Sequence, residues 1–125
     1  MADFPLLSRV VVLIVEDEPI VLMLAADTVE QAGFEALQAE NADVALRILE
    51  SRSDVRIVFT DVDMPGSMDG LKFAATVRRR WPPIEIILTS GHRVVASSDM
   101  PERTLFIPKP YEPDRVVATL RQLVA

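Results

Sequence analysis

An uninterrupted apolar run, Val10–Val15, narrows the choice of fold more than any other stretch of the chain. A strand with one face toward water alternates apolar and polar residues, and this run does not alternate. A short run of this kind suits a strand covered on both faces, as in a parallel sheet between two layers of helices. We therefore expect an α/β protein in which this strand is buried.

Strand-like and helix-like segments alternate along the rest of the chain. After the first run, β-branched and apolar stretches predict strands over 34–39, 54–60, 84–89 and 105–108. Apolar residues at helical spacing predict helices over about 19–33, 42–51, 70–81 and 113–124. The segment 92–101 has no clear helical period, so a helix there would be short or poorly formed. This order predicts a doubly wound, five-stranded parallel sheet with flanking helices.

Length, composition and charge restrict the classes of function. The 125 residues suit a single domain, 1–125, with residues 1–8 as a short N-terminal extension. The absence of cysteine removes disulfides, thiolate metal sites and cysteine nucleophiles. A net charge of −6 argues against direct nucleic-acid binding, and we interpret the one basic cluster, Arg78–Arg80, as a solvated helix end. Without a long apolar run or a basic secretory segment, we expect a cytoplasmic protein that does not bind membranes.

Polar residues collect where the expected strands end. In chain order these residues are Glu16 and Asp17, Asp61, Thr89 and Ser90, and Lys109. The carboxyl ends of parallel strands share one edge of the sheet, where open α/β sheets bind their ligands. Three carboxylates gathered there repel one another unless a cation lies among them. Their oxygen donors suit Mg²⁺, whereas a single histidine and no cysteine make zinc a poor fit.

Carboxylates, a divalent cation, an ammonium group and a hydroxyl together suit phosphoryl transfer onto an aspartate. Asp61 is the best candidate nucleophile because it stands alone, whereas Glu16 and Asp17 are adjacent and better placed as metal ligands. Each residue also has an ordinary structural explanation, such as a turn former, an acidic helix start or a surface lysine. Their joint appearance at the strand ends favours phosphoryl transfer.

Over nearly its whole length the chain resembles the CheY-like receiver domains of two-component response regulators. The resemblance rests on Val15-Glu16-Asp17-Glu18-Pro19, Thr60-Asp61-Val62-Asp63-Met64-Pro65, Met68-Asp69-Gly70, Leu88-Thr89-Ser90-Gly91 and Lys109-Pro110-Tyr111. It implies a flavodoxin-like (βα)5 fold and a phosphoacceptor that receives its phosphate from a histidine kinase or a histidine phosphotransfer protein. Such a domain catalyses only its own phosphorylation and dephosphorylation.

The resemblance also implies a ligand set for Mg²⁺ and a partner for the phosphoryl group. Asp17 and Asp61 would bind the cation directly, together with the backbone carbonyl of Asp63. Glu16 would assist through water. Lys109 would contact the phosphoryl oxygens, and its bond to the following proline would be cis.

Three features of the family pattern are altered or ambiguous in this sequence. The switch hydroxyl falls on Ser90, which precedes a small residue as the family requires, with Thr89 as the alternative. The switch aromatic falls on Phe106, which lacks the hydroxyl of the frequent tyrosine. The loop 65–70 is one residue longer than its common form, which would alter access to Asp61.

Three apolar residues, Ile20, Met23 and Leu24, fall off the buried stripe of their expected helix. The more ordinary explanation is burial of at least one of them against a neighbouring element. The resemblance offers another, a docking patch for a helical phosphodonor whose histidine must reach Asp61.

Because the chain stops after the last expected helix, we expect a single-domain receiver that acts through a downstream protein target or a phosphorelay. A phosphorylation-dependent homodimer is a further option. Two other functions compete with this one: a receiver-like interaction module that never uses phosphate, and an aspartate-nucleophile phosphatase acting on external substrates. Intact Asp17, Asp61 and Lys109 argue against the first, and the lack of a cap domain argues against the second.

Overall fold

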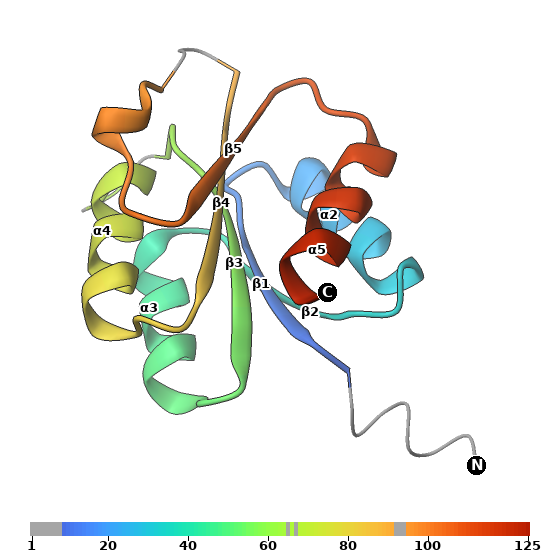
Figure 1. Cartoon of the computed structure of the whole chain (residues 1–125), viewed down its shortest axis with the longest axis horizontal. Helices are drawn as coiled ribbons and strands as arrows, with labels where there is room; N and C mark the ends of the chain where they lie inside the picture. Colours follow the sequence, from blue (N-terminus) through green and yellow to red (C-terminus); the bar gives the residue numbers. More distant parts are fainter. Residues whose placement is uncertain (1–8, 65, 67, 92–94) are drawn as a thin grey trace.

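One five-stranded parallel sheet forms the centre of the protein (Figure 1). The structure is a computed structural model that describes residues 9–64, 66, 68–91 and 95–125. The strands are β1 (Val11–Val15), β2 (Glu35–Ala39), β3 (Val55–Asp61), β4 (Glu85–Ser90) and β5 (Thr104–Pro108). Their order is β2-β1-β3-β4-β5, so the chain reverses its direction of travel across the sheet after β2. The carboxyl ends of β1 and β3 flank that reversal, the usual ligand-binding position in sheets of this type.

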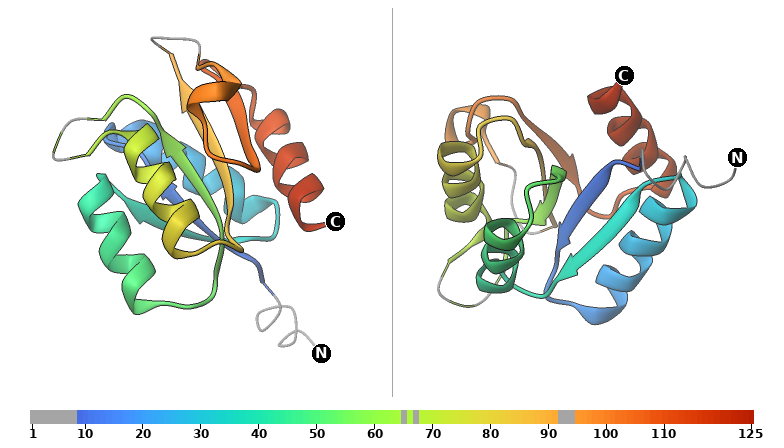
Figure 2. Two further views of the ribbon diagram at one scale, coloured as in Figure 1. Left: turned by 60° about the vertical axis from the view of Figure 1, so that its left-hand side comes forward. Right: turned by 90° about the horizontal axis from the view of Figure 1, so that it is seen from below.

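Helices cover both faces of the sheet. They are α2 (Pro19–Gln31), α3 (Ala42–Ser51), α4 (Gly70–Arg80) and α5 (Pro113–Val124), with a short 3-10 helix, η1 (Ser97–Asp99). Helices α2 and α5 pack on one face, and α3 and α4 on the other (Figure 2). Within the described part of the chain, no helix combines the length and apolarity needed to cross a membrane.

Strand β1 shows why its sequence is continuously apolar. Val12 and Ile14 belong to the core under α2 and α5, whereas Val11, Leu13 and Val15 belong to the core under α3 and α4. All five are buried, since successive side chains of a strand point to opposite faces and both faces are covered. The expectation of a two-sided, buried parallel strand is confirmed.

Element boundaries follow the predictions closely. Helices α3 and α5 match the expected ranges, and the other elements differ by one or two residues at an end. Asn41 caps α3, as its Oδ1 accepts a hydrogen bond from the Val44 amide at 2.8 Å. The buried side of α2 consists of Leu22, Ala25, Ala26 and Val29, the stripe predicted from helical spacing.

The connection between β4 and β5 departs from a full (βα)5 pattern. Among the described residues it contains only η1 and no α-helix, so four α-helices and not five accompany the five strands. The physical reason lies in the sequence of 92–101, which has no helical apolar period to pack against the sheet. Residues 92–94 of this segment lie outside the described residues.

Arg78 holds that connection in place, which corrects its interpretation as part of a solvated helix end. Its Nε donates to the carbonyl of Glu102 at 2.9 Å, and its Nη1 donates to those of Pro82 and Ile84, both at 2.7 Å. Its Nη2 donates to the carbonyl of Arg103 at 3.3 Å. Burial lowers the pKa of Arg78. One side chain of α4 thus ties the turn before β4 to the loop before β5.

Helix α4 begins in close contact with the end of β3. Asp69 caps it by accepting from the Lys72 amide at 2.9 Å, and the Gly70 amide donates to the carbonyl of Val62 at 2.9 Å. A Cβ on Gly70 would lie 2.1 Å from the carbonyl oxygen of Asp61 and 2.5 Å from the Cα of Val62. Only glycine allows the helix to start this close to Asp61.

Replacing Gly70 with alanine should therefore destabilise the protein by about 1–3 kcal/mol, because the start of α4 must move away from β3. Urea unfolding measures the loss, and amide NMR signals of residues 61–63 should shift. Gly33→Ala is the matched control. It has open space but a φ of +98°, so it should cost stability at the opposite edge of the sheet and leave residues 61–63 unchanged. A Gly70→Ala variant with unchanged stability would contradict this explanation of α4 placement.

Candidate functional site

The predicted polar residues meet at the carboxyl edge of the sheet. Strands β1 and β3 are neighbours, with Val15 opposite Thr60, so Glu16 and Asp61 follow side by side. Carboxylate oxygens of Glu16, Asp17 and Asp61 lie within 4.8 Å of one another. The structure thus brings together the three acidic residues that the sequence assigned to one edge.

Lys109 reaches this acidic group from the end of β5. Its Nζ lies 2.8 Å from Glu16 Oε1 and 3.1 Å from Asp61 Oδ2, so one ammonium group joins two carboxylates. Its amide donates to the carbonyl of Ser90 at 3.0 Å, which fixes the base of the side chain beside β4. A Cβ on Gly91 would lie 3.3 Å from that of Lys109, so a small residue there leaves room for the lysine. The Lys109–Pro110 bond is cis, as the resemblance implied.

Burial sets the electrostatics of the site. Glu16 and Asp61 are only 3% and 5% exposed. Burial raises the pKa of Glu16, although its hydrogen bond with Lys109 opposes the rise. Burial alone would lower the pKa of Lys109, but the hydrogen bond to Glu16 and the charge of Asp61 outweigh it, so that pKa lies above its ordinary value. Lys109 therefore stays charged at neutral pH.

Backbone amides hold the carboxylate oxygens that face away from Lys109. Glu16 Oε2 accepts from the Glu18 amide at 3.1 Å, and Asp61 Oδ1 accepts from the Asp63 amide at 3.2 Å. Oxygen-only donors at this spacing suit a hard divalent cation such as Mg²⁺, which needs one or two carboxylates and fills its remaining positions with water or phosphate. The role of the Asp63 carbonyl as a further ligand stays a prediction.

The two candidate hydroxyls differ in their surroundings. Ser90 Oγ donates to Asp63 Oδ2 at 2.5 Å. Thr89 lies opposite Asp61 in the sheet, and its Oγ1 is buried without a hydrogen-bond partner among the described residues. Thr89 also lines a void of about 10 Å³ together with Glu16, Asp61 and Tyr111, a volume that suits one water. Adjacent residues of a strand face opposite sides, so the two hydroxyls serve different surroundings.

Two aromatic residues lie near the site, and the sequence assigned a role to only one of them. Phe106, the predicted switch aromatic, is half-buried in β5 opposite Leu88 and packs against the core under α3 and α4. Tyr111 stacks on Phe59 with a centroid distance of 5.6 Å and an interplanar angle of 54°. Burial raises its pKa. Its place two residues after Lys109 was the signal available in the sequence.

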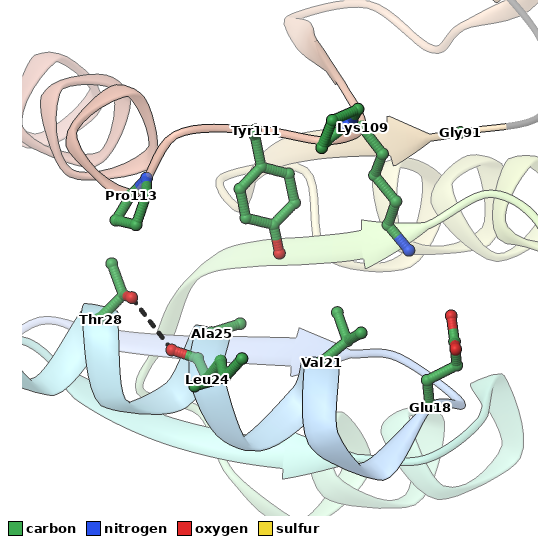
Figure 3. Close-up of a pocket in the computed structure, with 10 residues that line it drawn as sticks. Glu18, Val21, Leu24, Ala25, Thr28, Gly91, Lys109, Tyr111 and Pro113 are labelled. Atoms are coloured by element: carbon green, nitrogen blue, oxygen red, sulfur yellow. Dashed lines mark hydrogen bonds between the residues drawn. The ribbon is translucent and has the colours of Figure 1, made fainter.

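The predicted docking residues are exposed on the face of the molecule next to the site. Ile20, Met23 and Leu24 are 68%, 51% and 56% exposed, so the expectation that at least one of them is buried is wrong. Leu24 also lines a groove of about 490 Å³ between α2 and the loop after β5. Figure 3 shows Tyr111 pointing across this groove toward α2, with Glu18 and Lys109 at one end.

The expected longer loop, 65–70, is described only in part. Residues 65 and 67 lie outside the described residues, so its effect on access to Asp61 stays a prediction.

Replacing Lys109 with methionine should leave two buried carboxylates without their cation and lower the free energy of unfolding by about 2–4 kcal/mol. Adding Mg²⁺ should restore more stability to this variant than to the unaltered protein, because a bound cation supplies the missing positive charge. Urea unfolding with and without Mg²⁺ measures both effects. Lys72→Met, which removes the chain's other lysine, is the control. An equal response to Mg²⁺ in all three proteins would contradict this electrostatic explanation.

Comparison with known proteins shows which family and which relatives the chain is similar to. The sequence model of the response regulator receiver domain matches residues 12–121. Among curated proteins, the chain is 33% identical to the nitrogen assimilation regulatory protein NtrX of Azorhizobium caulinodans over 85% of the chain and 24% of the relative. It is also 33% identical to the hydrogenase transcriptional regulatory protein HoxA of Cupriavidus necator, over 94% of the chain and 24% of the relative. The chain thus spans about a quarter of these relatives' length.

Solved structures show the same arrangement of strands and helices. A response regulator receiver protein from Sinorhizobium medicae superposes with a TM-score of 0.87 at 26% identity, covering 94% of the chain and 96% of that protein. NtrX from Brucella abortus, in complex with ADP, superposes with a TM-score of 0.82 at 30% identity, covering 93% of the chain and 27% of that protein.

Proposed function

The chain belongs to the response regulator receiver domain family, and from this premise we propose that Asp61 accepts a phosphoryl group from a phosphohistidine donor in a Mg²⁺-dependent reaction. The observation that carries the proposal is the position of Lys109 Nζ, in contact with both Glu16 and Asp61 beside the third carboxylate, Asp17. A buried carboxylate, a fixed ammonium group and a set of cation ligands are the parts that phosphoryl transfer requires.

In this proposal an oxygen of Asp61 attacks phosphorus as the phosphorus–nitrogen bond of the donor breaks. The leaving imidazole nitrogen keeps the bonding electron pair and takes up a proton. Lys109 exchanges its contact with Asp61 Oδ2 for one with a phosphoryl oxygen, since the acyl phosphate no longer carries the original carboxylate charge. Asp17, Asp61 and the Asp63 carbonyl, with Glu16 assisting, would hold Mg²⁺, and the cation would supply positive charge to the phosphoryl oxygens.

The output follows from the charge that phosphorylation adds. Roughly one to two negative charges at Asp61 attract the hydroxyl of Ser90, which lies at the end of β4. Phe106 on β5 and the nearby connection from β4 would then rearrange for a downstream protein target. We infer that the domain works as a signalling component of the cytoplasm, as is typical of the family. The single-domain form and the phosphorylation-dependent homodimer stay predictions.

We further propose that Ile20, Met23 and Leu24 dock a helical phosphodonor. All three side chains are exposed on α2, and Leu24 also lines the groove that extends to the loop after β5, where Lys109 is another lining residue. A donor helix on this surface would hold its histidine near Asp61. An apolar helix face in a groove of this kind is a common recognition mode.

The first test is labelling with a small acyl-phosphate donor such as acetyl phosphate. We expect the unaltered protein to gain a phosphoryl group only with Mg²⁺, and Asp61→Asn to gain none. Asp54→Asn, a change at an exposed aspartate at the other edge of the sheet, should leave labelling intact. Absence of labelling in the unaltered protein would favour the phosphate-independent interaction module. Turnover of a model phosphoester would favour the phosphatase.

The docking surface is tested separately by replacing Ile20 with glutamate. We expect phosphotransfer from a cognate phosphohistidine protein to slow by about tenfold or more, because a charge replaces an exposed apolar anchor. Labelling by acetyl phosphate should stay unchanged, since no donor helix takes part. Glu30→Gln, an exposed change at the other end of α2, is the control. Equal loss of both reactions in Ile20→Glu would show damage to the site itself and contradict the docking role.

A further inference from the structure

We propose that the Asp63 carboxylate acts as a lock on the switch hydroxyl. It holds Ser90 Oγ in the unphosphorylated protein and competes for that hydroxyl with a phosphoryl group on Asp61. The inference rests on the proposed function and adds a regulatory contact within the same site. Asp63 is thereby a positioning residue through its side chain, a role separate from the cation-binding role implied for its backbone carbonyl.

The contact itself is short and partly buried. Ser90 Oγ donates to Asp63 Oδ2 at 2.5 Å, within the range of charge-assisted bonds between a hydroxyl and a carboxylate. Ser90 is 2% exposed. Partial shielding from water strengthens a hydrogen bond between a hydroxyl and a carboxyl group. In the unphosphorylated protein, the Ser90 hydroxyl therefore donates its hydrogen bond to Asp63.

Because backbone hydrogen bonds fix the end of β4, the Ser90 hydroxyl leaves Asp63 by rotation of its side chain. The carbonyl of Ser90 accepts from the Lys109 amide at 3.0 Å, and the carbonyl of Thr89 accepts from the Val62 amide at 2.9 Å. The end of β4 is thus held on both sides. A serine hydroxyl has one proton to donate, so Ser90 can serve Asp63 or a phosphoryl oxygen as a donor, but not both.

Phosphorylation makes the competition unequal. The Asp63 amide already donates to Asp61 Oδ1 at 3.2 Å, so its carboxylate belongs to a residue in direct contact with the phosphoacceptor. A phosphoryl group there adds negative charge close to Asp63 and repels its carboxylate. Asp63 is only half-buried, so water can solvate its carboxylate once Ser90 leaves. The Ser90–Asp63 hydrogen bond thus forms in the unphosphorylated protein, and breaking it costs little free energy once Asp61 is phosphorylated.

The test uses beryllofluoride with Mg²⁺ as the phosphoryl analogue and Asp63→Ala as the main variant, which keeps the backbone carbonyl. We expect Asp63→Ala to bind the analogue roughly tenfold more tightly, equivalent to about 1.4 kcal/mol, because the Asp63 carboxylate no longer competes for the Ser90 hydroxyl. Glu18→Gln removes an exposed charge near the site without touching Ser90, and should change the affinity much less. In a Ser90→Ala background, Asp63→Ala should gain no more than this charge control.

Two affinity results would overturn the lock. One is an affinity unchanged by Asp63→Ala, and the other is an equal gain with and without Ser90, which would reduce the effect to charge repulsion alone. Failure of the unaltered protein to bind the analogue would instead count against the proposed function. The lock is then judged without any analogue, from scalar couplings that report the Ser90 side-chain rotamer. We expect one dominant rotamer in the unaltered protein and a changed rotamer distribution in Asp63→Ala; the same distribution in both proteins would overturn the lock.

Discussion

Two carboxylates buried side by side, with one lysine between them, are the constraint on which this structure depends. Glu16 directly follows β1 and Asp61 ends the neighbouring β3, so burial removes both carboxylates from water and brings their like charges close together. Lys109 offsets both effects by contacting each carboxylate. In the strand order, β4 lies between β3 and β5, so a residue at the end of β5 needs a long side chain to reach Asp61. Gly91 leaves room for its path. The same Lys109 contacts therefore hold the strand ends together and form the candidate site.

The sequence predicted those parts of the protein that depend on local pattern. The continuous apolar run of β1 and the polar strand ends identified the sheet, the edge and the acidic group, because parallel strands align their carboxyl ends by topology. Side-chain partners could not be predicted in the same way. Nothing local distinguishes Arg78 from its solvated neighbours, and nothing shows that Ser90 turns toward Asp63, since both depend on segments distant in the chain. The described residues between β4 and β5 contain no α-helix, and the sequence indicated this only through weak apolar periodicity.

In the function proposed above, the two sides of the site serve different steps. On the α2 side, the groove is lined by Leu24 and Lys109, so the proposed docking of a donor and the proposed chemistry at Asp61 would share the loop after β5. On the β4 side, Ser90 donates a hydrogen bond to Asp63 at the strand end that precedes the connection to β5, and Arg78 binds the later part of that connection at the carbonyls of Glu102 and Arg103. Within the described residues this connection lacks the regular hydrogen bonding of an α-helix.

Chemical mapping of the phosphorylated residue tests the central claim most directly. Borohydride reduces an acyl phosphate of aspartate to homoserine, which mass spectrometry locates in the sequence. After reaction with acetyl phosphate and Mg²⁺, homoserine should appear at position 61 alone, and omission of Mg²⁺ should abolish it. Homoserine at Asp17 or Asp63, or labelling that persists without Mg²⁺, would contradict the assignment of Asp61 as the phosphoacceptor.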